Sequence, residues 1–141
     1  MRRLFIMRKD LNMSAGKLAA QVAHCAEAYW TNQMRNGHRL PVGDVMRASI
    51  YIDNNIFDEY ICGSFVKTIC EAKNKNHLLK AREKALELGF VEGVDFGLIR
   101  DNCLTELEPE DEDGRTTTGI WFKPLPDEQS KQISKKYQLY K

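Results

Sequence analysis

Lys17 and Asp101 are the charged residues whose sequence surroundings most clearly indicate a binding or catalytic site in this 141-residue sequence. Lys17 stands in the first turn of an expected helix, where unpaired backbone N–H groups and the helix dipole favour an anion. That combination suits a phosphate or a developing oxyanion. Asp101 ends an expected strand, and the hydroxyl groups of Thr105 and Thr116 belong to the segments that follow. An ammonium, a carboxylate and hydroxyls that meet could bind and polarise one small group.

A strand followed directly by a helix must bring Lys17 into place. Residues Arg3–Arg8 contain an apolar run without alternation, which is typical of a strand covered on both faces. Ser14 can accept hydrogen bonds from first-turn N–H groups, so the helix is expected to begin after it and to end near Asn36-Gly37. The order of these two elements predicts an α/β layer structure.

Two neighbouring stripes run along this first helix, because residues three and four apart share a face. The apolar stripe, which should pack on the sheet, consists of Leu18, Val22, Cys25 and Tyr29. The polar stripe consists of Lys17, Gln21 and His24. A helix seated by its apolar stripe leaves the polar stripe at the rim of a cleft, where it is available for chemistry.

Three further strands and two further helices are expected in the rest of the chain. The strands are Phe65–Cys70, Asp95–Arg100 and Arg115–Phe122, and the helices are Asn76–Leu88 and Asp127–Tyr137. The last two strands should pair as a hairpin across an acidic loop. The order predicts a single-domain α/β fold over residues 1–141, with three layers and a four-stranded mixed β-sheet flanked by helices. Residues 38–63 are expected to form a longer, irregular insertion with a short helical turn at Asp58–Cys62.

Charge is distributed unevenly although the net charge is only +1. Residues 1–47 hold eight basic and three acidic groups, whereas residues 101–113 hold seven acidic groups and no basic one. The whole molecule is therefore not the strongly basic body of a general nucleic-acid binder. One end of the sequence could face phosphates and another would repel them.

Several common site types are missing from the sequence. Four cysteines with no CxxC pair and no His/Cys ligand spacing indicate reduced thiols and argue against a metal site. The Gly16-Lys17 pair lacks the other residues of a P-loop, and no GxSxG, HExxH or GxGxxG motif occurs. No apolar run reaches the ~20 residues that cross a bilayer. We therefore expect a cytoplasmic protein without a membrane segment or a metal.

Lys17 and Asp101 are expected to lie at the same edge of the sheet. Ligands of open α/β sheets bind beyond the carboxyl ends of the parallel strands, which is where the first helix begins and the third strand ends. Taken singly, each residue also has a structural explanation: a solvated lysine, a turn-forming aspartate, and threonines that fill a loop or a strand.

Three blocks of the sequence resemble one known family. They are GKLAAQVAHCA at Gly16–Ala26, LIRDNCLTEL at Leu98–Leu107 and GRTTTGIWFKP at Gly114–Pro124. In this order they are similar to the motifs of the type 2 peptidyl-tRNA hydrolases, the archaeal and eukaryotic class. The resemblance covers most of the chain apart from residues about 38–63, and its first block is the most specific.

The resemblance implies a compact α/β fold with a four-stranded mixed sheet, commonly a homodimer. It also implies hydrolysis of the ester that joins a peptide to the 3′ ribose of tRNA in peptidyl-tRNA, which releases tRNA for translation without a metal or organic cofactor. Carried over position by position, the catalytic residues are Lys17, Asp101, Thr105 and Thr116, and the substrate-binding residues are Gly16, Gln21, His24 and Arg115.

These roles agree with the chemistry of the side chains. Asp101 would orient or deprotonate the attacking water, while Lys17 and the helix N-terminus would stabilise the oxyanion or hold the terminal phosphate. Thr105 and Thr116 would position water and substrate by hydrogen bonds. His24 is the alternative proton carrier, because histidine side chains ordinarily titrate near neutral pH.

The sequence departs from the family pattern in its second block, where Cys103 replaces a glycine and Glu106 replaces an amide. A carboxylate at Glu106 is expected to raise the cost of ionising both itself and the neighbouring aspartate. The carboxylates of residues 106–113 would oppose RNA phosphates. Two alternatives are therefore a non-catalytic relative that binds RNA or protein through Trp30, Trp121 and the insertion, and an esterase for another aminoacyl or peptidyl conjugate.

Overall fold

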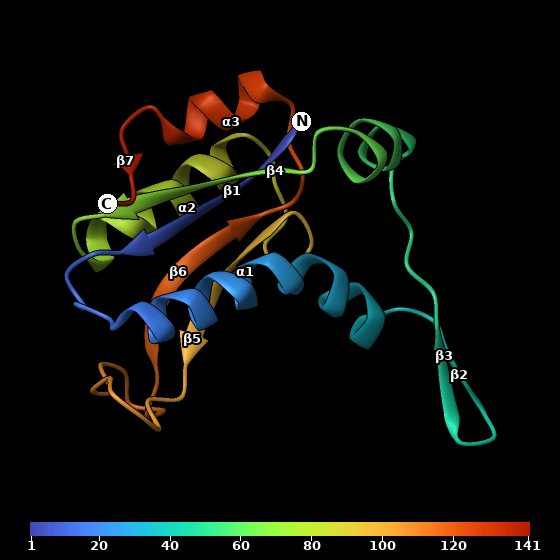
Figure 1. Ribbon diagram of the computed structural model, residues 1–141, viewed down its shortest axis with the longest axis horizontal. Coiled ribbons are helices and arrows are strands. Elements are labelled where there is room, and N and C mark those ends of the chain that lie inside the picture. Colours follow the sequence, from blue (N-terminus) through green and yellow to red (C-terminus); the bar gives the residue numbers. More distant parts are fainter.

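A five-stranded mixed sheet forms the middle layer of the molecule in the computed structural model, which describes all residues 1–141 (Figure 1). In spatial order its strands are β5 (Phe96–Asp101), β6 (Thr116–Phe122), β1 (Arg2–Arg8), β4 (Val66–Ala72) and β7 (Gln138–Leu139). β1 and β4 are parallel, and the other neighbours are antiparallel. The predicted α/β class, the mixed sheet and the hairpin of β5 and β6 are confirmed.

The fifth strand corrects the predicted count of four. β7 has only two residues, and it pairs with Cys70 and Glu71 at the edge of β4. Both of its residues are exposed, so its sequence carries no hydrophobic alternation. A strand of this length is formed by tertiary pairing and leaves no periodic pattern to read.

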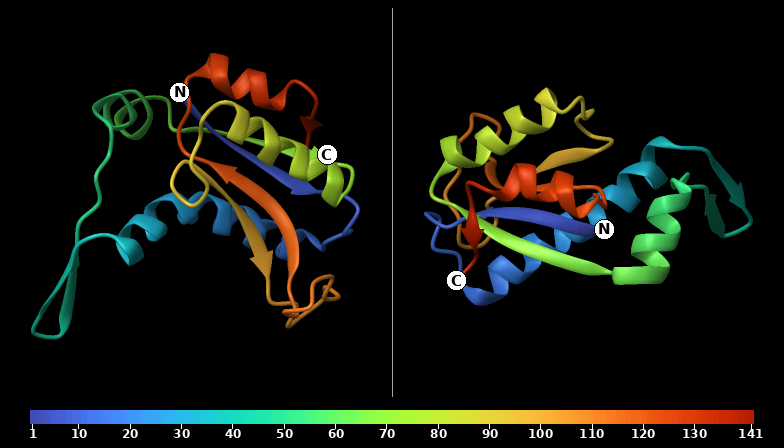
Figure 2. Two further views of the ribbon diagram at one scale, coloured as in Figure 1. Left: turned by 180° about the vertical axis from the view of Figure 1, so that it is seen from behind. Right: turned by 90° about the horizontal axis from the view of Figure 1, so that it is seen from above.

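Helices cover both faces of the sheet and complete the three predicted layers. α1 (Ala15–Asn36) lies on one face, and α2 (Lys75–Glu87) and α3 (Asp127–Ser134) lie on the other (Figure 2). α1 contributes to one apolar cluster, and α2 and α3 contribute together to a second one on the opposite face. No helix of the chain combines the length and the apolarity needed to cross a membrane.

Strand β1 divides its side chains between the two cores. Phe5 and Met7 pack with α1, whereas Leu4 and Ile6 pack with α2 and α3. All four are fully buried. This two-sided burial explains why the strand is a continuous apolar run.

Residues 38–63, which were expected to be irregular, contain a regular hairpin. Strands β2 (Arg39–Val42) and β3 (Val45–Ala48) pair with each other, extend away from the sheet, and are exposed throughout (Figure 1). The π-helical segment η1 (Ile56–Ser64) follows and includes the predicted turn at Asp58–Cys62. Because the hairpin buries neither face, its sequence has no hydrophobic pattern from which it could be predicted.

Candidate active site

The N-terminus of α1 is capped as the sequence predicts. Ser14 Oγ accepts a hydrogen bond from the backbone N–H of Lys17 at 3.3 Å. The expected apolar stripe packs on the sheet, with Cys25 and Tyr29 buried. The polar stripe, which carries Lys17, is thereby held beside the ends of β5 and β6.

A buried arginine fixes the position of α1 on the sheet. Arg3 is 1% exposed, and its guanidinium donates to the backbone oxygens of Phe122 (2.7 Å), Cys25 (3.0 Å) and Ala26 (3.1 Å). No carboxylate pairs with it, and burial lowers the pKa of Arg3 to about 10. Sequence reasoning missed this residue, although a charged side chain next to a buried apolar run is a recognisable signal.

Four of the predicted site residues meet near the start of α1. Lys17 Nζ donates to Asp101 Oδ1 at 2.8 Å and to Thr105 Oγ1 at 3.2 Å. Gln21 Nε2 donates to the same Asp101 oxygen at 3.1 Å. The side chains of Lys17 and Asp101 are only 13% and 12% exposed. Ions in such a recess interact more strongly than ions on an open surface.

A threonine outside the predicted set holds Gln21 in place. Thr118 Oγ1 donates to Gln21 Oε1 at 2.6 Å, and both residues are buried. The pairing of β5 with β6 shifts from Ile99↔Gly119 to Arg100↔Thr117, which leaves Thr118 at a bulge. Bulges re-aim side chains, and this one sends a hydroxyl toward α1. Only the run of three threonines hinted at such a role.

The carboxyl group of Asp101 is held in its ionised form. Burial would raise the pKa of Asp101, but hydrogen bonds from Lys17 and from the backbone N–H of Cys103 outweigh burial and keep that pKa below its ordinary value. The carboxylate is therefore charged at neutral pH and across the mildly acidic range.

Cys103 adopts a backbone conformation that normally favours glycine. Its φ is +58°, and in this conformation its N–H donates to Asp101 Oδ2 at 2.9 Å. A left-handed conformation costs a non-glycine residue roughly 1–2 kcal/mol. The turn that positions the carboxylate therefore carries backbone strain at Cys103.

Replacing Cys103 with glycine should remove this strain. We expect Cys103→Gly to raise the free energy of unfolding by about 0.5–1 kcal/mol, since part of the gain is offset by the greater freedom of glycine in the unfolded chain. Urea unfolding would measure the change. Cys62→Gly is the matched control: Cys62 is exposed in η1 without a positive φ, and its replacement should be destabilising. Equal effects of the two substitutions would contradict the strain.

The expectation that the carboxylates of Glu106 and Asp101 would oppose each other's ionisation is wrong, because both pKa values are lowered. The Glu106 side chain accepts hydrogen bonds from Ser14 Oγ (2.6 Å) and Ser14 N–H (2.9 Å) at the N-terminus of α1. The Ser14 hydroxyl chiefly, and then its backbone N–H, lower the pKa of Glu106. Donors at the helix N-terminus thus stabilise the second anion, just as Lys17 stabilises Asp101.

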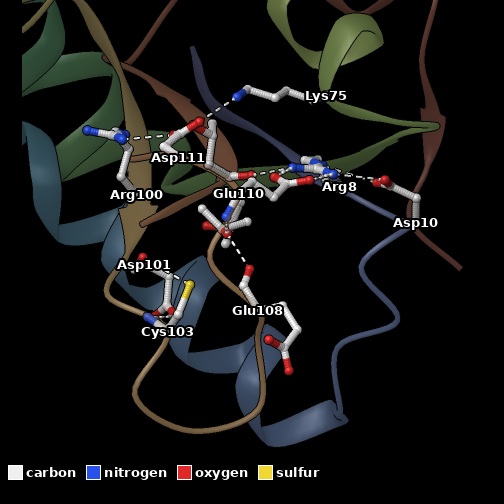
Figure 3. A network of polar contacts seen from close by, with 12 residues as sticks. Arg8, Asp10, Lys75, Arg100, Asp101, Cys103, Glu108, Glu110 and Asp111 are labelled. Carbon is white, nitrogen blue, oxygen red and sulfur yellow. Dashed lines mark hydrogen bonds and ion pairs between the residues drawn. The ribbon is translucent and has the colours of Figure 1, made fainter. Parts of the chain in front are cut away.

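The acidic loop folds back onto basic residues instead of projecting freely into solvent (Figure 3). Three of its carboxylates form ion pairs with residues of β1, α2 and β5. The pairs are Glu110 with Arg8, Asp111 with Lys75 and Arg100, and Asp113 with Arg100. The loop therefore opposes RNA phosphates less than its sequence suggested, because much of its charge is compensated within the chain.

Thr116 lies beside Asp101 in the sheet, but its hydroxyl faces other partners. It is fully buried, donates to Glu108 O at 2.7 Å and accepts from Glu110 N–H at 3.0 Å. It makes no hydrogen bond with Lys17 or Asp101. In this arrangement the side chain anchors the acidic loop, and its catalytic role stays a prediction.

The remaining predicted residues lie around the cluster without joining it. Gly16 faces open space, because nothing would come within 4 Å of a Cβ added there. Arg115 is exposed and its guanidinium forms no ion pair. His24 is exposed one turn beyond Gln21, in a shallow hollow that Arg100 also lines. No group of three or more His, Cys, Asp or Glu side chains is arranged to hold a metal ion.

Comparisons with known proteins agree with this geometry. A family model described as "Peptidyl-tRNA hydrolase PTH2" matches residues 1–140. Proteins named peptidyl-tRNA hydrolase are similar over most of the chain, from Thermoplasma acidophilum (26% identical, covering 94% of this chain and 92% of the relative), Methanopyrus kandleri (32%, covering 77% and 75%) and Pyrobaculum aerophilum (30%, covering 96% and 93%).

A solved structure extends the comparison to the fold. A protein of unknown function from Agrobacterium tumefaciens superposes with a TM-score of 0.55 at 11% identity, and the match covers 99% of this chain and 97% of that one. At this identity the likeness concerns the fold alone. The family model spans nearly the whole sequence, so the resemblance stated above is confirmed, and the chain belongs to the PTH2 family of peptidyl-tRNA hydrolases.

Proposed function

We propose that this chain hydrolyses the ester bond between peptide and tRNA in peptidyl-tRNA, and that the reaction takes place at the Lys17–Asp101 pair. The observation that carries the proposal is the 2.8 Å contact between the Lys17 ammonium and the Asp101 carboxylate, which are 84 positions apart in the sequence. The family match over residues 1–140 supports the same reaction.

The hydrogen-bond inventory of the pair leaves one donor and one acceptor free for substrate. Asp101 Oδ1 accepts from Lys17 and Gln21, whereas Oδ2 accepts only from the Cys103 N–H. A carboxylate oxygen has two lone pairs, so Oδ2 retains one acceptor position. Lys17 uses two of its three N–H donors on Asp101 and Thr105, so one donor remains.

The free positions match the needs of ester hydrolysis. A water bound to Asp101 Oδ2 would be oriented for attack on the ester carbonyl, and the free Lys17 N–H would stabilise the oxyanion that forms. A carboxylate with a lowered pKa is a weak base, so Asp101 serves mainly to orient the water, and it takes up the water proton only as the new carbon–oxygen bond forms. The tetrahedral intermediate then collapses: the bond from the carbonyl carbon to the ribose 3′ oxygen breaks, and this oxygen leaves with the proton that Asp101 took up. Thr105 would position the same water through its hydroxyl.

His24 is the alternative proton carrier, and the geometry does not favour it. It lies seven positions after Lys17, which is about 10 Å along the helix axis, and its side chain makes no hydrogen bond with any member of the cluster. We expect His24→Gln to change kcat for peptidyl-tRNA by less than about threefold. A loss comparable to the roughly 10²-fold or greater effect of removing a general base would contradict this assignment. Steady-state kinetics with the folded variant would decide between them.

The non-catalytic alternative is not favoured. The similar proteins are named as hydrolases, and Trp121, one of the side chains proposed for a binding surface, is buried against α1. Hydrolysis of an N-blocked aminoacyl-tRNA by the purified chain tests the function directly. Comparison with a small N-blocked aminoacyl ester tests whether tRNA is required, because an esterase of broader specificity would cleave both equally well.

We further propose that the chain acts in the cytoplasm, where it recycles tRNA for translation, and that it functions as a homodimer. These three statements rest on the family to which the chain belongs. Light scattering coupled to size-exclusion chromatography would measure the mass in solution, and a mass equal to the 16.3 kDa of one chain would contradict the dimer.

A further inference from the structure

A hollow with three lysine side chains in its lining opens between the start of α2 and the end of α3. It has a volume of about 360 Å³, and we name it the basic cleft. Its lining residues are Glu71, Lys73, His77, Lys135, Lys136, Tyr137 and Gln138. A second hollow of about 310 Å³ adjoins it and shares four of these residues. It adds Lys80 and Lys84 together with Glu83 and Glu87, and Lys84 pairs with Glu87. The lysines without an acidic partner are therefore concentrated in the basic cleft.

The lysines of the basic cleft have no acidic partners within the chain. Lys73, Lys135 and Lys136 are exposed and form neither ion pairs nor side-chain hydrogen bonds. The single acid, Glu71, already accepts hydrogen bonds from Gln138 and from the Lys141 N–H. By contrast, Arg8, Lys75 and Arg100 are paired with carboxylates of the acidic loop. The three lysines of the cleft are therefore available to pair with an external anion.

The floor of the basic cleft is fixed by hydrogen bonds. His77 Nδ1 accepts from the Lys73 backbone N–H at 3.0 Å, so the ring proton is on Nε2 and that nitrogen is a donor. The His77 ring stacks on Tyr137 at 4.4 Å between centroids, and Tyr137 Oη donates to His77 O at 2.6 Å. This packing holds the Nε2–H donor of His77 in a fixed position among the lysines.

The basic cleft and the Lys17–Asp101 pair lie at the same end of the sheet. β1 and β4 are parallel neighbours, and the Lys9 N–H donates to Ala72 O just beyond them, at 2.8 Å. The helices that follow, α1 and α2, therefore begin at one edge, as Figure 1 shows. An extended ligand that reaches the start of α1 can continue along this edge to the start of α2.

We propose that the basic cleft binds the phosphodiester backbone of the tRNA part of the substrate while the ester lies at Lys17 and Asp101. This inference rests on the proposed function. An open groove with several unpaired lysines suits a chain of phosphates better than one enclosed small ligand, and such contacts position a nucleic acid without reading its sequence. The free ammonium groups would release counterions from the RNA, so binding there depends on salt.

The triple variant Lys73→Gln, Lys135→Gln, Lys136→Gln tests this inference. Binding of deacylated tRNA would be followed by fluorescence anisotropy between 50 and 200 mM salt. We expect the Kd to rise about tenfold or more near 0.1 M salt, and the slope of log K against log salt to fall by about 2 to 3. KM for N-blocked aminoacyl-tRNA should rise with kcat retained. Cleavage of an N-blocked aminoacyl-adenosine, which has no backbone phosphates, should not change.

The matched control is Arg39→Gln, Arg47→Gln, Lys67→Gln, which removes the same charge from the hairpin and from the far end of β4. We expect tRNA binding by this control to resemble that of the unchanged chain. Normal affinity and salt slope in the cleft variant would overturn the inference, and so would an equal loss in the control. Stronger competition by phosphatidylserine vesicles than by tRNA would also overturn it.

Failure of the unchanged chain to hydrolyse peptidyl-tRNA would instead contradict the proposed function, because tRNA binding is measured independently of turnover.

Discussion

Replacing Asp101 with asparagine is expected to lower kcat for peptidyl-tRNA hydrolysis by about 10²–10⁴-fold, the range for loss of a positioned proton acceptor. Asparagine has the same shape and its amide oxygen can still accept from Lys17, so the arrangement around the site should persist. It cannot accept a proton from water, and one of its two terminal atoms becomes a donor. Single-turnover hydrolysis of N-blocked aminoacyl-tRNA would measure the loss.

Asp95 provides a matched control for this substitution. Its carboxylate also accepts from a lysine, Lys123 at 2.9 Å, and from a backbone N–H, that of Val91 at 2.8 Å. Asp95→Asn therefore makes the same chemical change to a carboxylate with equivalent contacts, just before β5 and away from the cluster. We expect it to reduce stability modestly and to leave kcat unchanged. Equal activity losses in the two variants would show that the effect of Asp101→Asn is structural.

Replacing Lys17 with methionine is expected to lower kcat/KM by about 10²–10³-fold, the range for loss of one oxyanion donor. Methionine keeps an unbranched side chain of similar length in α1 but removes the charge and all three donors. Lys123→Met is the matched control, because it removes the corresponding lysine from Asp95. That control should retain full activity.

The Lys17→Met variant should also change the pH dependence of the activity that remains. Lys17 is the strongest of the groups that lower the pKa of Asp101, against burial, which raises it. Without the lysine the carboxyl group takes up a proton at higher pH. Activity that needs the carboxylate is present above its pKa and is lost as the pH falls through it, so the acid limb should move to higher pH. An acid limb that stays in place would contradict the coupling of these two groups.

The elements that position the site could be predicted because their patterns are local. The apolar run of β1 follows from burial on both faces, and Ser14 before a run of helix formers marks the start of α1. These two elements fix the place of Lys17. The expectation that Asp101 lies at the same edge followed from the topology of α/β sheets, and the 2.8 Å contact agrees with it.

The parts that could not be predicted depend on contacts between distant residues. Glu110 is 102 positions from its partner Arg8, so the charge run of the acidic loop gave no sign of its compensation. Thr118 reaches Gln21 only because of a bulge in β6. The ionisation of Glu106 was misjudged because the donors at Ser14 belong to another element. Local patterns specify elements, whereas these interactions arise when the elements pack.

A double-mutant cycle tests the central claim most directly. Single-turnover rates on N-blocked aminoacyl-tRNA would be compared for the unchanged chain, Lys17→Met, Asp101→Asn and the double variant, with the Lys123 and Asp95 cycle as reference. Groups that act together in one step show strongly non-additive losses. We predict that the double variant is at most about tenfold slower than the slower single variant. A loss equal to the product of the two single losses, or full activity in either single variant, would contradict a shared catalytic site.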